Sequence, residues 1–369
     1  MSVQVSYKKQ FLVMLLLFLV LIIVVEITAR TYDFLNPGCG FIGNDVFDHT
    51  NWYTTYWICV DPYLIDWDYS EIRQYIPNQN HNTININSHG FRGFEFSEQK
   101  FDDTYRIFVV GGSTVFGYGS TSDKTSIPGY LQNEFDKLDL NKKVEVINAG
   151  IGFATSFEEE YLIKKKLMQY DPDLIVIFDG GNDVYTKNKE IILDHGNPVK
   201  NPFQIGTYDF YLTPIVIYKN IVKPFNSQLK IDDVLDDTNS YDYVTNNWES
   251  NIKKICKLGK NNNFKVAIFL QPLLISTEKT LSFDEKEMKY KELESNKGQI
   301  NKELLSKFSH SIQSFTDECH ISADLTNIFD KKSEAIFYDW IHVSDNGNGI
   351  IAENIYQKII PLVLEDISK

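Results

Sequence analysis

Short apolar runs alternate with longer mixed segments from residue 101 to the end of the chain. Runs of β-branched residues between turn signals are typical of strands that are covered on both faces. Strands that alternate with helices predict a parallel sheet with right-handed crossover connections. We therefore expect an α/β fold: a doubly wound, flavodoxin-like sheet between two layers of helices. The expected strands are RIFVV at 106–110, KVEVIN at 143–148, DLIVIF at 173–178 and KVAIFL at 265–270.

The mixed segments between these runs predict helices. Residues 126–138, 157–170 and 247–263 are expected to form crossover helices, and 344–367 an amphipathic C-terminal helix. Residues 187–245 show no clean alternation, so we expect an insertion or lid over the strand ends in that stretch.

The N-terminus carries an uncharged run from Gln10 to Val25, preceded by Lys8 and Lys9. At ~1.5 Å per residue this run covers about 24 Å of a ~30 Å hydrocarbon core, and a short helical extension completes the crossing. No convincing small-x-small cleavage site follows, so an uncleaved transmembrane anchor at 11–29 is favoured over a removed signal peptide. A buried core helix is the weaker alternative, because no polar face is present.

The two lysines before the apolar run orient the N-terminus inward. We therefore expect residues 1–10 to form a cytoplasmic tail and the rest of the chain to lie outside the cell membrane, which the chain crosses once. Residues 30–100 form an extracytoplasmic lead-in, rich in Tyr, Trp, Asn and Asp and without a long periodic run. Residues 101–369 form the principal domain.

The charge balance is acidic, with 36 basic against 50 acidic side chains and a net charge of −14. A broad phosphate-binding face is therefore not expected, and nucleic acid is excluded as an expected partner. The partners that remain are the membrane, through the N-terminal helix, and a neutral or small substrate.

The chain has four cysteines, an even number that suits an oxidising exterior. Cys39 and Cys59 lie close in sequence and are the expected bridge, although four cysteines, including Cys256 and Cys319, allow three pairings. None has C-x-x-C spacing, so we expect no zinc site.

The stretch RIFVVGGSTVFGYG, at 106–119, is a strand that ends in a turn of small residues. A dinucleotide fingerprint needs glycines at i, i+2 and i+5, and neither register supplies them. A P-loop needs lysine where Tyr118 stands, so no nucleotide cofactor is expected. The remaining interpretation is a nucleophile, Ser113, at the carboxyl end of the first sheet strand. Most such serines only cap a helix, so this one needs a base and an oxyanion hole.

A base and its orienting acid are found in FYDWIHVSDNGNG, at 337–349. Asp339 lies three residues before His342, so both side chains can share one side of a turn and the carboxylate can fix the imidazole tautomer. Taken alone, a surface or capping pair is the commoner use of this spacing.

Candidate oxyanion donors follow the other strands. Asn182, in GGND, carries a side-chain amide, and Gly152, in NAGIGFATS, can present a backbone N–H. In the flavodoxin-like strand order, the strands that end in Ser113 and Asn182 are neighbours.

These segments together resemble the SGNH (GDSL-type) hydrolase family over about residues 101–369. VVGGSTVFG resembles its first block, NAGIGFATS its second, GGND its third and DWIH its fourth, in family order. The resemblance implies a serine esterase with Ser113, Asp339 and His342 as the catalytic triad. It also implies an oxyanion hole formed by the Ser113 N–H, the N–H near Gly152 and Asn182. Phe153 stands where many members have glycine, which leaves the donor of the second block open.

The expected activity is hydrolysis of an ester, an O-acyl or O-acetyl group on an exterior glycan or similar substrate, through an acyl-enzyme. Transfer of the acyl group to an acceptor hydroxyl would use the same residues and stays open. The alternative from another class is a membrane-tethered envelope scaffold that retains a vestigial triad.

Overall fold

The structure is a computed structural model that describes residues 6–35, 42–70, 72–186 and 238–369. The described residues fall into two compact units, one containing 6–35 and the other containing 42–186 and 238–369. Most of the expected insertion at 187–245 lies outside the described residues, as does Cys39.

The first unit holds helix α1 (Tyr7–Leu35). Among the described residues, α1 is the one helix that is long and apolar enough to cross a membrane. A signal sequence near the N-terminus can have the same length and composition. The candidate span runs from Tyr7 to Tyr32, and an 18-residue window within it has a mean hydropathy of 3.1. Near its end, Arg30 pairs with Glu26 one turn earlier at 2.9 Å.

The second unit is built on a parallel sheet with the order β6-β5-β7-β8-β9. This is the flavodoxin-like order expected from the sequence, with strand pairs that are all parallel. The fifth strand, ISAD, is short and half-buried, and the apolar pattern did not predict it. The strands are β5 (Thr104–Gly111), β6 (Lys143–Gly150), β7 (Leu174–Asp179), β8 (Lys265–Leu270) and β9 (Ile321–Asp324).

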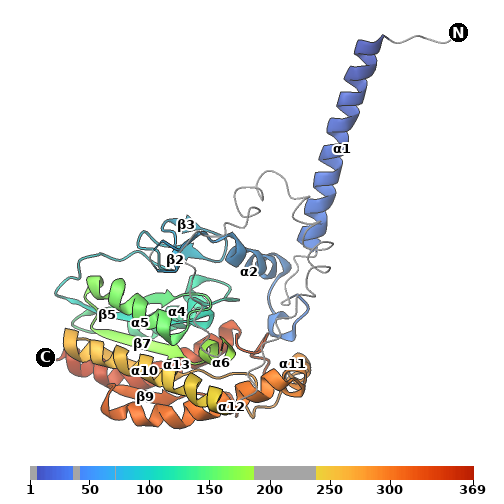
Figure 1. The fold of residues 1–369 in the computed structure, drawn as a ribbon. Helices are drawn as coiled ribbons and strands as arrows, with labels where there is room; N and C mark the ends of the chain where they lie inside the picture. The colour runs from blue at the N-terminus through green and yellow to red at the C-terminus, as the bar shows by residue number, and fades with distance from the viewer. Residues whose placement is uncertain (1–5, 36–41, 71, 187–237) are drawn as a thin grey trace. The chain divides into compact units, whose positions relative to one another are not determined.

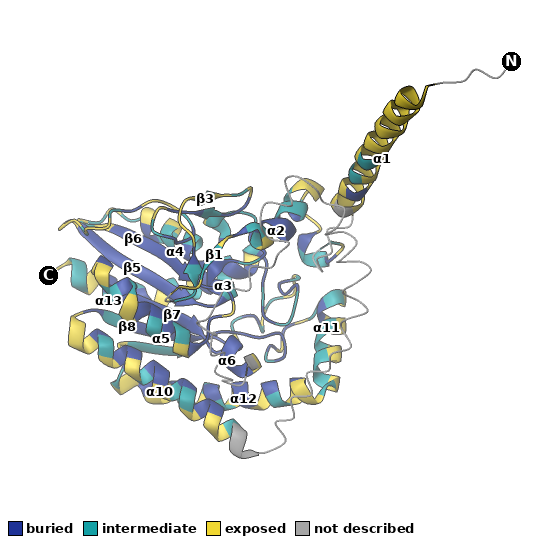
Figure 2. Ribbon diagram, turned by 45° about the horizontal axis from the view of Figure 1, so that its top comes forward, coloured by how far each residue is buried: buried dark blue, intermediate teal, exposed yellow. Residues whose placement is uncertain are grey.

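Helices cover both faces of the sheet, as the strand composition requires (Figure 1). On β5, Phe108 and Val110 pack into one core with α5, α10 and α12, while Ile107 and Val109 pack into a second core with α4 and α13. The strands are buried almost throughout, whereas the helices have exposed outer faces (Figure 2). The helices are α4 (Ile127–Asp136), α5 (Ser156–Lys165), α10 (Thr238–Asn262), α12 (Asn296–Ile312) and α13 (Asp345–Ile367).

Helix α10 begins nine residues before the helix expected at 247–263, so residues 238–245 belong to it and not to an insertion. This helix start was not predicted, because the sequence TNSYDYVT is polar. The C-terminal helix, in contrast, begins where expected, because the Ser344 side chain accepts a hydrogen bond from the Gly347 N–H and caps it.

The lead-in, residues 42–100, belongs to the same compact unit as the sheet. Arg92, only 3% exposed, ties the two together because its guanidinium donates to the carbonyls of Thr83, Phe116 and Gly117. The lead-in elements are η1 (Asp45–Phe47), α2 (Trp52–Leu64) and two short hairpins, β1 (Trp67–Asp68) with β2 (Gln74–Tyr75) and β3 (Gln79–Asn80) with β4 (Asn85–Ile86).

The remaining elements are short connections and one further helix. They are α3 (Ser113–Phe116), η2 (Asp123–Thr125), η3 (Leu167–Tyr170), α6 (Gly181–Thr186), α11 (Phe283–Glu294) and η5 (Gln313–Asp317).

A disulfide joins Cys256 of α10 to Cys319, just before β9. Cys59 is also disulfide-bonded. Because Cys39 lies outside the described residues, its expected pairing with Cys59 stays a prediction.

A fully buried arginine fastens the first sheet strand. Arg106 bonds Glu145 of β6 at 3.0 and 3.1 Å, and it also donates to the carbonyls of Ser97, Glu98 and Tyr170. A buried guanidinium is tolerated only when its donors are satisfied in this way.

We expect Arg106→Met to lower the free energy of unfolding by about 3–5 kcal/mol, because Glu145 is left as a buried carboxylate without its internal partner. Lys143→Met is the matched control. Lys143 contacts the same carboxylate at 3.2 Å but is 70% exposed, so its loss should cost at most about 1 kcal/mol. Urea unfolding measures both values, and equal costs would contradict this account.

Candidate active site

The turn after β5 places Ser113 at the carboxyl edge of the sheet. A side chain on Gly111 would collide with the Phe178 carbonyl and with Val115, and one on Gly112 would collide with the Asn182 amide. Glycine is therefore required because backbone and side chains approach closely there. Helix α3 begins at Ser113 itself, and the serine stays partly accessible.

The loop before α13 brings a histidine to this serine. The Nε2 atom of His342 lies 2.7 Å from the Ser113 Oγ atom, although 229 positions separate the two residues. On the other side of the ring, Nδ1 lies 2.7 Å from Oδ2 of Asp339. A carboxylate at Nδ1 selects the tautomer with its proton there, which leaves Nε2 to accept the serine proton.

Asp339 is itself held by the backbone of its loop. Its Oδ1 atom accepts hydrogen bonds from the N–H groups of Ile341 and His342, at 2.9 and 2.7 Å. Burial acts to raise the pKa of Asp339, but the imidazole and these hydrogen bonds outweigh it and lower the pKa below its ordinary value. Asp339 therefore remains a carboxylate.

Two tyrosine rings flank the imidazole. The Tyr338 ring is stacked on His342 with centroids 5.7 Å apart, and the Tyr118 ring lies 5.0 Å away. Burial raises the pKa of both hydroxyls, so both stay neutral.

Asn182 lies at the start of α6 and faces the serine turn. Its Nδ2 atom packs against Gly112 and donates to the Ala154 carbonyl at 2.7 Å. The side chain is 9% exposed. Asn182 therefore brings an oriented amide to the place where the strands β5 and β7 end.

The turn after β6 differs from the expectation for Gly152. The Gly152 N–H donates to the hydroxyl of Tyr75 at 2.9 Å, so this N–H is not directed to the serine. The next residue, Phe153, has φ +63°. Within the described part of the chain its N–H has no hydrogen-bond acceptor. Phenylalanine rarely adopts positive φ, and Phe153 stands where the family that the sequence resembles often has glycine, which adopts it readily.

Sequence reasoning also missed a role for Asp183. Its carboxylate accepts hydrogen bonds from the Ser156 N–H and hydroxyl, at 2.9 and 2.6 Å, and so ties α6 to the first residue of α5. Asp179 and Glu159 are also buried carboxyl residues, and the Trp248 side chain donates to Asp179 at 3.1 Å. In the described chain no group of His, Cys, Asp and Glu side chains is arranged to hold a metal ion.

Burial raises the pKa values of these three carboxyls, and for Asp179 and Glu159 the neighbouring acidic groups raise the pKa further. The pKa of Asp183 rises to about 6, and those of Asp179 and Glu159 rise well above their ordinary values. Neither oxygen of Glu159 has a hydrogen-bond donor among the described residues. Glu159 is therefore held as a neutral acid.

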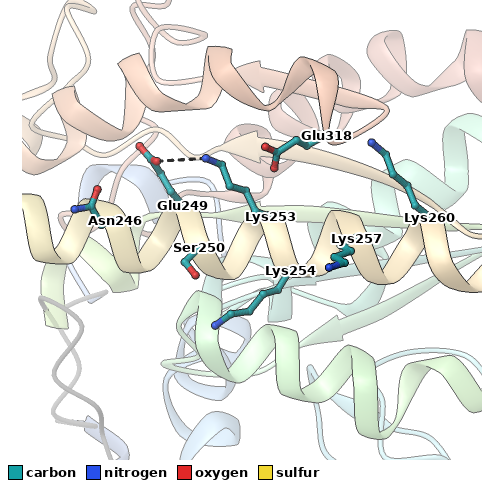
Figure 3. A pocket seen from close by; sticks show the side chains of 8 residues that line it. All are labelled: Asn246, Glu249, Ser250, Lys253, Lys254, Lys257, Lys260 and Glu318. Atoms are coloured by element: carbon teal, nitrogen blue, oxygen red, sulfur yellow. Dashed lines mark ion pairs between the residues drawn. The ribbon is translucent and has the colours of Figure 1, made fainter.

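A groove of about 580 Å³ lies elsewhere, along the second half of α10 (Figure 3). None of the residues predicted for the site lines this groove. Its lining residues are Asn246, Glu249, Ser250, Lys253, Lys254, Lys257, Lys260 and Glu318.

Comparison with known families gives one match. Residues 107–355 match the profile described as GDSL-like Lipase/Acylhydrolase, which is more than half of the chain. This range contains all five residues predicted for the site. No curated protein matches the chain.

Solved structures of similar fold include three esterase-type proteins. A putative lipolytic protein of the G-D-S-L family from Desulfitobacterium hafniense DCB-2 has 13% identity and a TM-score of 0.39, covering 68% of this chain and 98% of its own. The psychrotrophic esterase EstA from Pseudoalteromonas sp. has 17% identity and a TM-score of 0.39, covering 71% and 99%. A mutant acetylxylan esterase from Geobacillus stearothermophilus has 12% identity and a TM-score of 0.40, covering 69% and 94%.

The buried carboxyls make stability depend on pH. A carboxyl with a raised folded-state pKa stabilises the protein below its unfolded pKa, and this contribution is lost as the pH rises through the folded value. We expect stability to fall between pH 5 and pH 8, and we expect Glu159→Gln to reduce that fall because the amide cannot ionise. Glu160→Gln, at the partly exposed neighbouring position, is the control. Urea unfolding midpoints of the parent and of both variants at pH 5 and pH 8 measure the effect. An equal change of the midpoint between the two pH values in all three proteins would refute the expectation.

Proposed function

The chain belongs to the family of GDSL-like lipases and acylhydrolases, which are ester-cleaving hydrolases, and we propose that Ser113, His342 and Asp339 form its catalytic triad. The observation that carries this proposal is the unbroken line of hydrogen bonds from the Ser113 hydroxyl through His342 to Asp339, both at 2.7 Å. A nucleophile, a base and an orienting acid in this order are what acyl transfer through serine requires.

In the first step the Ser113 oxygen attacks the ester carbonyl while His342 Nε2 takes its proton. The bond from Oγ to the acyl carbon forms, and the carbonyl electrons move to the oxygen. Asp339 stabilises the imidazolium that results. His342 then donates the proton to the leaving alcohol, which departs and leaves the acyl-enzyme.

The oxyanion is held by the donors that surround Ser113. The Asn182 amide is one of them, and the backbone N–H groups of Ser113 and Phe153 complete the set. Phe153 takes the role first expected of Gly152, because the Gly152 N–H is already bonded to Tyr75. Water then gives a proton to His342 Nε2 and attacks the acyl carbon, the bond from this carbon to Ser113 Oγ breaks, and the carboxylic acid leaves while His342 returns the proton to Oγ.

The substrate is an O-acyl ester, such as an O-acetyl group on a glycan or a similar molecule outside the cell. Helix α1 anchors the enzyme in the cell membrane, with Lys8 and Lys9 on the cytoplasmic side and the catalytic unit outside. The length and apolar composition of α1 support the anchor, and the two lysines support the orientation.

We expect Ser113→Ala to lower kcat/KM for p-nitrophenyl acetate by on the order of 10⁴-fold or more, since the covalent route is lost. Ser122→Ala, a partly exposed serine in the adjoining segment, is the control and should retain the activity. Thermal unfolding confirms that both variants are folded. Equal turnover by Ser113→Ala and the parent would refute the proposed function.

Asn182→Ala should lower kcat by roughly 10²–10³-fold with a small change in KM, because an oxyanion donor acts mainly in the transition state. Steady-state kinetics with the same ester provide the measurement. A rise in KM alone would mean that Asn182 binds substrate and does not stabilise the oxyanion.

A further inference from the structure

The turn after β6 supports two of the proposed oxyanion donors. It carries the Phe153 N–H, and its Ala154 carbonyl accepts the hydrogen bond that orients Asn182. The position of this turn therefore determines where both donors lie relative to Ser113.

The other N–H groups of the turn are all engaged. The Ile151 N–H donates to the Gly111 carbonyl at 2.9 Å, and the Ala154 N–H donates to the Ile151 carbonyl at 3.0 Å. The Gly152 N–H donates to Tyr75. Two of these bonds stay within the turn and the β5 end, whereas the bond to Tyr75 reaches a different segment of the chain.

The backbone conformation of Phe153 requires a constraint from outside the turn, such as the hydrogen bond to Tyr75. Its φ of +63° is unfavourable for a large side chain, and the side chain is 68% exposed, so its own packing contributes little. A strained backbone of this kind persists only when the surrounding structure fixes it. The hydroxyl that accepts the preceding N–H supplies such a constraint.

Tyr75 contacts both the segment that follows β5 and the turn that follows β6. It is 3% exposed, and its ring lies 4.8 Å from that of Phe116 and 4.4 Å from that of Trp67. Phe116 ends α3, the helix that begins at Ser113. Tyr75 thus contacts the serine helix with its ring and the oxyanion turn with its hydroxyl.

Tyr75 belongs to the lead-in, which precedes the family-matched region at 107–355. The lead-in reaches the histidine side of the site as well. The Phe47 ring lies 5.3 Å from that of Tyr338, and Asn44 donates to the Tyr338 carbonyl at 3.5 Å. Tyr338 in turn stacks on His342.

We infer that Tyr75 is a positioning residue for the oxyanion hole. The lead-in therefore contributes to the function of the active site. The hydroxyl of Tyr75 holds the Gly152 N–H and thereby keeps the Phe153 N–H and the Asn182 amide directed at the ester oxygen. This inference rests on the proposed function for its effect on turnover, but the effect on the turn itself is independent of catalysis.

The first experiment compares Tyr75→Phe with Tyr105→Phe in the full-length protein. Tyr105 is the matched control, because it is also 3% exposed and donates a partly buried hydrogen bond, at 2.9 Å to Asp366, away from the site. Tyr75→Phe should lower kcat for p-nitrophenyl acetate roughly tenfold or more with KM within about twofold, since donor misplacement weakens the transition state. Tyr105→Phe should keep kcat.

Amide hydrogen exchange provides a readout without catalysis. Exchange of the Gly152 amide, which donates to the Tyr75 hydroxyl, should be roughly five- to tenfold faster in Tyr75→Phe than in the parent, and unchanged in Tyr105→Phe. Unchanged exchange in Tyr75→Phe, or equal kcat losses in both variants, would overturn the inference.

A double variant tests the link to the strained residue. Asparagine adopts left-handed conformations more readily than phenylalanine, so adding Phe153→Asn to Tyr75→Phe should restore part of the lost kcat. If the kcat losses of the two single variants simply add in the double variant, the result would count against the inference. If the parent has no turnover that depends on Ser113, the proposed function fails, and the exchange measurement alone decides whether Tyr75 holds the turn.

Discussion

The order of the parallel strands is the constraint on which the candidate site depends. Strands β6, β5 and β7 are neighbours, and each ends at the same edge of the sheet in a turn that carries one part of the site. Ser113 follows β5, Phe153 follows β6 and Asn182 follows β7. The imidazole of His342 and the carboxylate of Asp339 come from a distant loop, before α13, and α13 packs on the same domain.

The turns are held to one another by polar contacts behind the site. Asn182 bonds Ala154, Asp183 bonds Ser156, and Tyr75 bonds Gly152, so three separate groups fix the segment between β6 and α5. All three groups are buried, and hydrogen bonds of buried groups are costly to break in a low-dielectric interior. Rigid turns of this kind keep hydrogen-bond donors in place before the substrate arrives, which is the basis of oxyanion stabilisation.

Much of the fold could be predicted from the sequence, because buried parallel strands leave continuous β-branched runs. The strand order and four of the five strands were confirmed, as was the start of the C-terminal helix near Ser344. Strand β9 was missed because it is short and half-buried, and the start of α10 because it is polar. The family motifs placed Ser113, Asp339, His342 and Asn182 in one neighbourhood, but their roles remain proposals. The hydrogen bond from Gly152 to Tyr75 could not be predicted, since it depends on how a separate segment packs.

The central claim is that Ser113 is a nucleophile activated by His342. Intact-protein mass spectrometry with peptide mapping, after treatment with a fluorophosphonate, tests it most directly. The account predicts a single phosphonyl group on Ser113 in the parent and little or none in His342→Ala, since the serine is then left without its base. A folded parent that remains unmodified, or one that is modified at another residue, would contradict the claim.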